Sequence, residues 1–516
     1  MIKNYLIVSL LCSFFGFSQF NPSAPWMSNS STSRNEATID ELVTSFNQYW
    51  STRDKNARGS GYKPFMRWEY HWRNYANEQG YIMTSEDFWN VWRQKNQSRA
   101  NRNNSSLPVS NWQPKGPFTH TNTGSWSSGQ GRVNIVHVDP SNSNTIYLGA
   151  PAGGIWKSIN AGSTWTPLTD ELPQIGVSGI AVDYSNSNVI YIVTGDKDAG
   201  DSYSVGVYKS TDGGLTWNAT GVMGGSNPSR AGDILIHPTN NQILWCATNN
   251  GIYKTTNAGN TWSQVQSGDF SQGSIRLKPG DPSTIYGVSD TSFYRSTDTG
   301  TTFSQLSSGL PVSSSRLLLD VTPANANYVY ILSANTTGDF QGVYKSVNSG
   351  ATFTATNTTT DVFESNQSWY DLALAVSSTN AEEIYTGCLN VWKSTNGGAS
   401  LTKLNNWSSP TAPSYTHADI HYLGFYGNKL FCGSDGGIYF SNNGGRNFTD
   451  LTAGVQISQF YKIAVSRQSA GKMMGGLQDN GGYAYSDNQW KNYYGADGMD
   501  TAINPNNPNQ DRKSVV

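Results

Sequence analysis

Residues 206–217 read Gly-Val-Tyr-Lys-Ser-Thr-Asp-Gly-Gly-Leu-Thr-Trp, and this stretch carries the pattern that decides the fold. A strand-like run ends at Lys209. The turn that follows has Ser or Thr first, Asp or Asn third, Gly fifth and, in six of seven copies, an aromatic residue eighth. The other copies begin at residues 158, 255, 296, 346, 394 and 441, so neighbouring copies start 41 to 52 residues apart. A period of about 40–50 residues with strand-like units predicts an all-β protein, a β-propeller of about seven or more four-stranded blades.

The repeated turn has a structural explanation in each of its conserved positions. The Asp or Asn side chain accepts hydrogen bonds from backbone amides ahead of it, and Gly adopts the positive φ that closes the hairpin. The aromatic residue buries a large apolar area between neighbouring sheets. We therefore assign a structural role, not a catalytic one, to the third residue of each copy: Asn160, Asp212, Asn257, Asp298, Asn348, Asn396 and Asn443.

Composition excludes several classes of protein. The chain has 516 residues with 14% charged residues, a net charge of −2 and 52 glycines. This balance gives no reason to expect nucleic acid or an anionic membrane as a partner, and no later run is long enough for a membrane span. Cys246, Cys388 and Cys432 are expected to be small buried hydrophobic residues rather than a disulfide framework.

The N-terminus has the features of a secretory signal peptide. Lys3 supplies the positive end and residues 5–17 the apolar core, with cleavage expected near residue 19. Residues 1–19 therefore predict a secreted or cell-surface protein.

A small helical unit is expected over residues 36–95, followed by a linker over 96–110. Thr38 to Glu41 has capping-box spacing, and apolar residues follow at helical intervals. Further aromatic residues predict two more helices, one near Trp68 and Trp72 and one near Phe88 and Trp92. The aromatic residues are expected to pack against one another, with sugar binding as the alternative.

The repeats then divide the rest of the chain. Blades one to seven are expected over 111–455, and an eighth blade with a degenerate turn (Ser486 to Trp490), followed by the start of a ninth, over 456–510. Residues 511–516 read like the translation of a sequencing adapter, and we interpret them as a non-native tail on a truncated chain.

Candidate binding residues are expected on the face that surrounds the central channel mouth, where loops join the second and third strands of each blade. The loop of blade two offers Asp196, Asp198 and Asp201. Their spacing would suit calcium, but a solvated, Gly-hinged loop is the preferred interpretation. Later loops add Asp435, Asp479 and Asn480, and Asp497 begins an inner strand. Alternation along a strand would place His417, Asp419 and His421 on one side, where they would bind a metal or close the channel by hydrogen bonds. Closure is the preferred interpretation, so no metal and no cofactor are expected.

The repeated turn resembles the Asp-box of sialidases, sortilin-type receptors and two-propeller xyloglucan-type glycosidases. In those glycosidases one catalytic Asp lies in an Asp-x-Gly-Gly turn of the first blade and the other in a similar turn that opens the second propeller. The resemblance implies the second role for Asp479, but the first position reads Pro151-Ala152-Gly153-Gly154, with Pro151 in place of the Asp. No Phe/Tyr-Arg-Ile-Pro motif supports a sialidase.

Nearly the whole mature chain is similar to secreted Asp-box propeller proteins of the Bacteroidetes, described as sortilin-like or glycosyl-hydrolase-like. Residues 59–69, 195–201 and 477–481 carry this resemblance, which implies a C-terminal type IX secretion signal that the sequence lacks. Two functions remain open. One is a propeller that binds an extracellular glycan or peptide, and the other is a glycoside hydrolase that uses Asp479 with Asp196 or Asp497. The replacement at Pro151 favours binding.

Overall fold

The computed structural model describes residues 37–55, 62–83, 85–101, 113–120, 128–173, 175–200, 202–225 and 227–515. They belong to two compact units, one within Met1–Pro108 and one within Val109–Val516. The expected signal peptide lies outside the described residues. None of the described helices is long and apolar enough to cross a membrane.

The first unit is helical, as predicted. It contains α1 (Ile39–Trp50), α2 (Tyr62–Trp72), the 3-10 turn η2 (Arg73–Tyr75) and α3 (Ser85–Asn101). Thr38 caps α1 with the expected capping box, because its side chain accepts from the Glu41 amide while the Glu41 carboxylate accepts from the Thr38 amide. Helix α3 continues to Asn101, six residues into the expected linker, because the polar run after Lys95 contains no Gly or Pro to end it.

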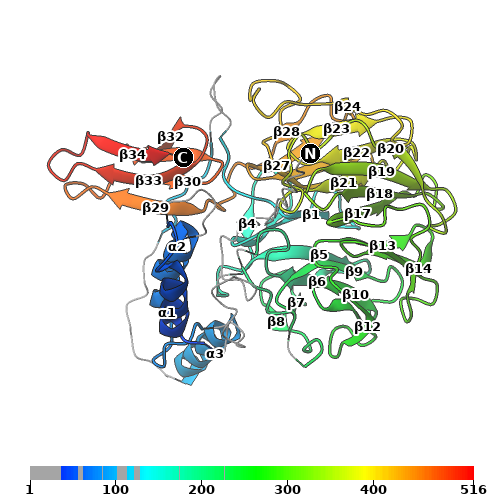
Figure 1. Ribbon diagram of the computed structural model, residues 1–516, viewed down its shortest axis with the longest axis horizontal. Coiled ribbons are helices and arrows are strands. Elements are labelled where there is room, and N and C mark those ends of the chain that lie inside the picture. The colour runs from blue at the N-terminus through cyan, green and yellow to red at the C-terminus, as the bar shows by residue number, and fades with distance from the viewer. Residues whose placement is uncertain are drawn as a thin grey trace, which may run out of the picture. The chain divides into compact units, whose positions relative to one another are not determined.

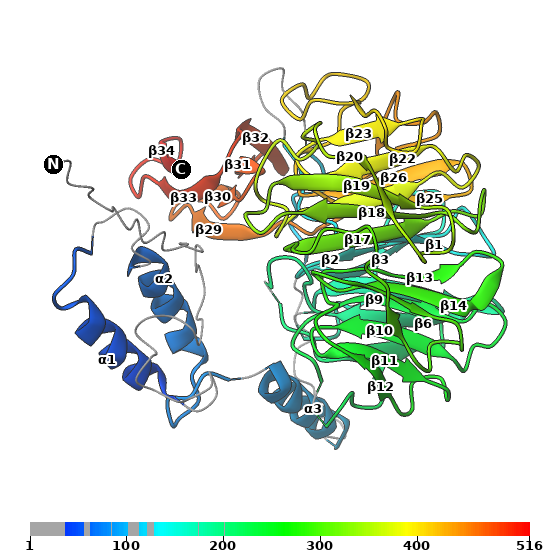
Figure 2. The ribbon, with the colours of Figure 1, turned by 45° about the vertical axis from the view of Figure 1, so that its right-hand side comes forward.

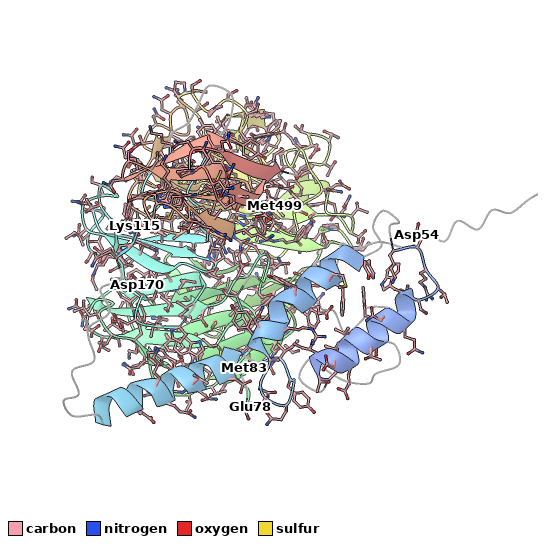
Figure 3. All side chains as sticks on the ribbon, turned by 90° about the vertical axis from the view of Figure 1, so that its left-hand side faces the viewer. Asp54, Glu78, Met83, Lys115, Asp170 and Met499 are labelled. Atoms are coloured by element: carbon pink, nitrogen blue, oxygen red, sulfur yellow. The ribbon has the colours of Figure 1, made fainter. Side chains whose placement is uncertain are left out.

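Aromatic side chains form the core of this unit. Phe46 of α1 stacks on Phe65 of α2 with ring centroids 3.7 Å apart, and Trp50 and Trp68 are buried beside them. Figure 3 shows α1 and α2 side by side with side chains between them, and labels Glu78 and Met83 in the segment that follows α2. Packing within the unit therefore accounts for the buried aromatic residues, as expected.

The second unit contains eight four-stranded antiparallel sheets, each made from consecutive strands. The first four are β1 (Ile135–Val138), β2 (Ile146–Ala150), β3 (Gly154–Ser158) and β4 (Thr166–Pro167); β5 (Val177–Asp183), β6 (Asn186–Thr194), β7 (Val207–Ser210) and β8 (Asn218–Ala219); β9 (Ala231–Ile236), β10 (Leu244–Thr248), β11 (Gly251–Thr255) and β12 (Ser263–Ser267); and β13 (Ile275–Lys278), β14 (Asp281–Val288), β15 (Phe293–Ser296) and β16 (Ser304–Gln305). The next three are β17 (Arg316–Val321), β18 (Val329–Ala334), β19 (Phe340–Ser346) and β20 (Thr354–Asn357); β21 (Ala373–Val376), β22 (Ile384–Gly387), β23 (Val391–Ser394) and β24 (Thr402–Lys403); and β25 (Ile420–Tyr426), β26 (Lys429–Ser434), β27 (Gly437–Ser441) and β28 (Thr449–Asp450).

These seven sheets are the blades of a ring, in which the last sheet contacts the first. The seventh blade meets the first, because the Val133 amide donates to the Ser434 carbonyl at 3.0 Å and Trp165 Nε1 donates to the Leu451 carbonyl at 2.8 Å. Apolar residues of both blades share one core cluster. The β-propeller predicted from the sequence is therefore confirmed, with seven blades in the ring.

Each of the seven repeated turns has the expected hydrogen bonds. In blade two, Ser210 Oγ donates to Asp212 Oδ1 at 2.7 Å, and the Thr216 amide donates to the same oxygen at 2.9 Å. The closing Trp217 donates to the Leu168 carbonyl of blade one at 2.9 Å. The Trp that closes this turn therefore links its blade to the preceding one.

The eighth sheet lies beside the ring in Figures 1 and 2. It comprises β29 (Phe460–Val465), β30 (Met473–Leu477), β31 (Gly481–Ser486) and β32 (Gln489–Tyr494), and the hairpin of β33 (Gly498–Ile503) and β34 (Asp511–Val515) follows. Its expected degenerate Asp-box is instead a two-residue hairpin turn, in which Asp487 and Asn488 both have positive φ. These two residue types tolerate the left-handed conformation that such a turn requires.

Two further features of the ring bear on its chemistry. The innermost strands surround a cavity of about 290 Å³ whose lining includes His137, Arg276 and Tyr422. Cys246, Cys388 and Cys432 are buried free thiols, as expected.

Candidate functional site

One mouth of the ring holds a buried network of charged side chains. The loop after β6 supplies Asp196 and Asp198, and the loop after β26 supplies Asp435. Arg132 and His421 come from the starts of inner strands, so residues more than 200 positions apart in sequence meet here. The ring brings them together because the corresponding end of every blade faces the same mouth.

His421 lies at the centre of this network. Its Nδ1 is 2.9 Å from Asp198 Oδ2 and its Nε2 is 2.9 Å from Asp435 Oδ1, and all three side chains are buried. Burial alone would lower the pKa of His421, but the adjacent Asp435 and Asp198 raise it to about 9. His421 is therefore a cation at neutral pH that donates a hydrogen bond to each carboxylate.

Two arginines neutralise the acidic loop of blade two. Arg132 Nη2 donates to Asp196 Oδ2 at 2.6 Å, and Arg316 Nη2 donates to Asp198 Oδ1 at 2.8 Å. The expectation of a solvated loop is wrong for both carboxylates, because these ion pairs allow them to be buried. Burial opposes ionisation of Asp198, but the nearby Arg316 lowers its pKa below the ordinary value. Asp201 lies outside the described residues.

Asp479 lines a small pocket beside this network. The pocket measures about 60 Å³, and its lining includes Arg132, Tyr370, Asp435, Gln459, Gln478 and Asp479. Burial, together with the charge of Asp435 and a hydrogen bond to it, raises the pKa of Asp479 far above its usual range. Asp479 is therefore a carboxylic acid at neutral pH, and its backbone amide donates to Asp497 Oδ1 at 2.9 Å.

His417, Asp419 and His421 do not share one side of a strand, so that expectation is wrong. Strand β25 begins only at Ile420, and Asp419 has a left-handed φ of 60°, which turns the chain just before the strand. His417 instead contacts the Asp479 carbonyl through Nε2 at 3.2 Å. Both ring nitrogens of His421 are occupied by carboxylates, so these three residues are not arranged around one metal position.

Three carboxylates of the described residues come together where a metal would fit. Asp419, Asp435 and Asp479 each offer an oxygen, and these three oxygens lie within 4.8 Å of one another. Asn480 borders the group, since its Nδ2 donates to the Asp435 carbonyl at 3.0 Å. Apart from Asp201, every predicted binding or catalytic residue thus lies in this network or directly beside it.

Sequence reasoning missed four members of the network: Arg132, Arg316, Gln367 and Tyr370. The Tyr370 hydroxyl donates to Asp435 Oδ2, and Gln367 Nε2 donates to Asp419 Oδ1, each at 2.5 Å. Arg132 and Arg316 stand at the starts of innermost strands, the same place in the repeat as His417. That shared position was the signal in the sequence that could have identified the two arginines.

Comparison with known proteins places the chain near xyloglucanases in sequence, although no family model matches it. It is 37% identical to the xyloglucanase Xgh74A of Acetivibrio thermocellus over 135 residues, which are 24% of this chain and 16% of that protein. It is 29% identical to a xyloglucanase of a Paenibacillus species over 167 residues, 30% of this chain and again 16% of that protein. The alignments therefore span about a sixth of these curated relatives.

Solved structures with the same fold include GH74 enzymes. The enzyme from Niastella koreensis superposes with a TM-score of 0.53 at 20% identity, covering 76% of this chain and 65% of that one. The GH74 xyloglucanase from Xanthomonas campestris also superposes with a TM-score of 0.53, at 16% identity, covering 73% of this chain and 63% of that one. This chain therefore has a β-propeller fold like that of GH74 xyloglucanases, with partial homology to xyloglucanases in sequence.

Proposed function

We propose that this chain is an extracellular glycan-binding propeller whose site is the pocket at Asp479. The observation that carries the proposal is the pair of exposed aromatic side chains beside this pocket. Trp369 is 60% exposed, and its ring lies 5.6 Å from that of Tyr370, which lines the pocket. Tyr461 is 49% exposed and donates a hydrogen bond to Gln478, which also lines it. Flat aromatic faces around polar groups suit the alternating apolar and hydroxyl surfaces of a sugar chain.

Binding is favoured over hydrolysis by the arrangement of the carboxylates. Glycoside hydrolysis needs two carboxyl groups roughly 5–10 Å apart on opposite sides of the scissile bond. The pocket lining has only Asp435 and Asp479, which are hydrogen-bonded to each other, and Asp435 is also held by His421 and Tyr370. Pro151, which stands where the resemblance would place the other acid, has no carboxyl group to contribute.

Xyloglucan is the first ligand to test, because the curated relatives are xyloglucanases. We expect affinity electrophoresis in gels containing xyloglucan to retard the protein, and Trp369→Ala or Tyr461→Ala to raise Kd by about tenfold, equivalent to about 1.4 kcal/mol. Tyr184→Ala is the matched control, since Tyr184 is 51% exposed but lies at the opposite end of an inner strand. Equal retardation of all variants, or none of the wild type on any plant or microbial β-glucan, would refute the proposal.

Hydrolysis is the second candidate function, and one observation favours it. Asp479 keeps its proton at neutral pH, which is the state that a general acid requires. A reducing-sugar assay on the same glycans, with Asp479→Asn as control, tests this function. Release of reducing sugar by the wild type and not by the variant would make the protein a glycosidase. Binding without sugar release would support a non-catalytic glycan-binding site.

A further inference from the structure

The central cavity of the ring extends from the charged network to the opposite mouth. At the network end its lining includes His421, which is buried in that network. At the other end its lining includes Tyr184 and Pro323, which lie just after the innermost strands β5 and β17 and are exposed. The cavity is therefore a pocket that solvent reaches from the mouth opposite the pocket at Asp479.

This central pocket has the size and the mixed lining of a small-molecule site. Its volume is about 290 Å³, and apolar side chains of three innermost strands form part of its wall: Ile180 and Val182 of β5, Leu318 of β17, and Leu374 and Val376 of β21. Sites for small molecules commonly measure about 300–1,000 Å³ and combine apolar walls with a few polar groups that orient the ligand. The hydrogen-bonding groups of the lining should therefore indicate which ligand fits.

The two carboxylates that line the central pocket already have hydrogen-bond donors. Asp233 Oδ2 accepts from Arg276 Nη1 at 2.6 Å, and its Oδ1 accepts from the Ile234 amide at 3.0 Å. Asp320 Oδ1 accepts from Arg276 Nε at 3.1 Å, and its Oδ2 accepts from the Val376 amide at 2.8 Å. All four carboxylate oxygens are thus bound to groups of the protein.

Two cationic side chains of the lining, in contrast, have N–H donors that are not used. Lys197 follows β6, and its ammonium forms no hydrogen bond or ion pair within the described part of the chain. Arg276 is 29% exposed, and its Nη2 has no hydrogen-bond partner among the same residues. An ammonium has three N–H donors and Nη2 has two, so the unused hydrogen-bonding capacity at these charged groups consists of donors on cations.

We propose that the central pocket binds a small organic monoanion, a carboxylate on a compact apolar body. The carboxylate would accept hydrogen bonds from Lys197 and Arg276, and the apolar body would pack against the side chains of β5, β17 and β21. Asp233 and Asp320 lie beside Arg276, so a second negative charge on the ligand would be repelled, which favours a carboxylate over a phosphate dianion. This inference does not depend on the proposed glycan, whose pocket lies at the other mouth.

Titration of the full chain with benzoate and with hexanoate, followed by isothermal calorimetry, tests the proposal. Benzamide and hexanamide are the uncharged controls, because each has nearly the shape of its carboxylate. We expect one carboxylate to bind per chain, saturably and at least about tenfold more tightly than its amide, since hydrogen bonds to charged groups are the stronger ones. Equal binding of carboxylates and amides, or no saturable binding of either carboxylate, would overturn the proposal.

Variants of the two cations test where the anion binds. Lys197→Met should weaken carboxylate binding at least about tenfold with little change in Tm, because the ammonium has no ion pair to lose. Arg276→Lys should also weaken it, since the change keeps a positive charge beside Asp233 and Asp320 but removes Nη2. Lys209→Met is the matched control, because Lys209 is also half-buried but lies on β7 outside the lining.

The outcomes separate this site from a general effect of charge and from the glycan site. Binding by Lys197→Met at wild-type affinity, or equal weakening by Lys209→Met, would show that the anion does not bind at Lys197. Xyloglucan gels should retard Lys197→Met and the wild type equally, so a failure of either proposal leaves the other open to its own test.

Discussion

His421 owes its charge to the two carboxylates between which it is buried. Neither Asp198 nor Asp435 could remain ionised at this depth without a compensating charge, and each accepts a hydrogen bond at 2.9 Å. Breaking such a buried group by removing one member leaves an uncompensated charge, which costs far more than the intact group contributes.

Replacement of His421 should therefore be strongly destabilising. We expect His421→Gln to lower the free energy of unfolding by about 3–5 kcal/mol, measured by urea denaturation at pH 7. His237→Gln, in the turn after β9, is the control and should cost under about 1 kcal/mol, because His237 forms no ion pair in the described residues. Similar losses for the two variants would show that the buried charge of His421 is not what stabilises the mouth.

His137 is the opposite case, a histidine kept neutral by burial. Its Nε2 is buried without a hydrogen-bond partner among the described residues, and burial lowers its pKa to about 4. Because the ordinary pKa is 6.5, the unfolded chain takes up a proton before the folded chain does as pH falls. The folded state therefore loses stability from this group between pH 6.5 and pH 4.

Substitution by phenylalanine should remove this pH dependence. His137→Phe keeps a ring beside Tyr426, whose centroid lies 5.8 Å away, but cannot titrate. Between pH 7 and pH 4.5 we expect the wild type to lose up to about 3 kcal/mol more than the variant in urea unfolding. Parallel losses in the two proteins would contradict this account.

The repeated turns differ in how well their fourth residue tolerates a left-handed backbone conformation. Their fourth residue is left-handed in every copy: Gly in three copies, but Ala161, Ala258, Thr299 and Ser349 in the others. Thr299 has a φ of 59°, a conformation that is strained for a β-branched side chain. The hydrogen bonds and burial around this turn must therefore hold Thr299 in place.

Glycine at this position should relieve the strain. We expect Thr299→Gly to raise the free energy of unfolding by up to about 1 kcal/mol, since the relief exceeds the entropy that Gly loses on folding. Gly213→Thr, the reciprocal change in blade two, where φ is 77°, should lower it by about 1–2 kcal/mol. Urea midpoints of the two variants are the measurement, and a shift in the same direction for both would disprove the explanation.

The two compact units have separate cores, and this should be visible when the whole chain unfolds. Phe46 and Phe65 belong to the helical unit, while Phe270 is fully buried in a cluster of β-strand residues in the ring. Calorimetry should show two transitions, of which only one is accompanied by loss of helical circular dichroism.

Core truncations should assign the two transitions. Phe46→Ala should destabilise only the helical unit by about 3–5 kcal/mol, and Phe270→Ala only the ring by a similar amount. If either variant shifts both transitions equally, the two units unfold together and are not independent in stability.

The features that could be predicted from the sequence are those that short-range interactions determine. The turn at Asp212, the cap at Thr38 and the spacing of the blades all follow from residues within a few positions of one another. The pairs Arg132–Asp196 and Arg316–Asp198 span 64 and 118 residues, and they exist because seven blades close the ring. Predicting them requires the number and rotation of the blades, which no local pattern contains. The left-handed turn at Asp419 was missed for a different reason, because alternation along a strand assumes that the strand has already begun.

The junction between blade seven and blade one has a mechanical consequence. Every blade is built from one continuous segment, so no strand from one end of the ring is woven into the sheet at the other end. The ring is therefore closed by side-chain contacts, a few backbone amide hydrogen bonds and the Trp165 indole, and not by strands shared between its two ends. Tension applied across residues 128 and 457 would therefore separate blade seven from blade one first. The blades would move apart while each four-stranded sheet stayed intact.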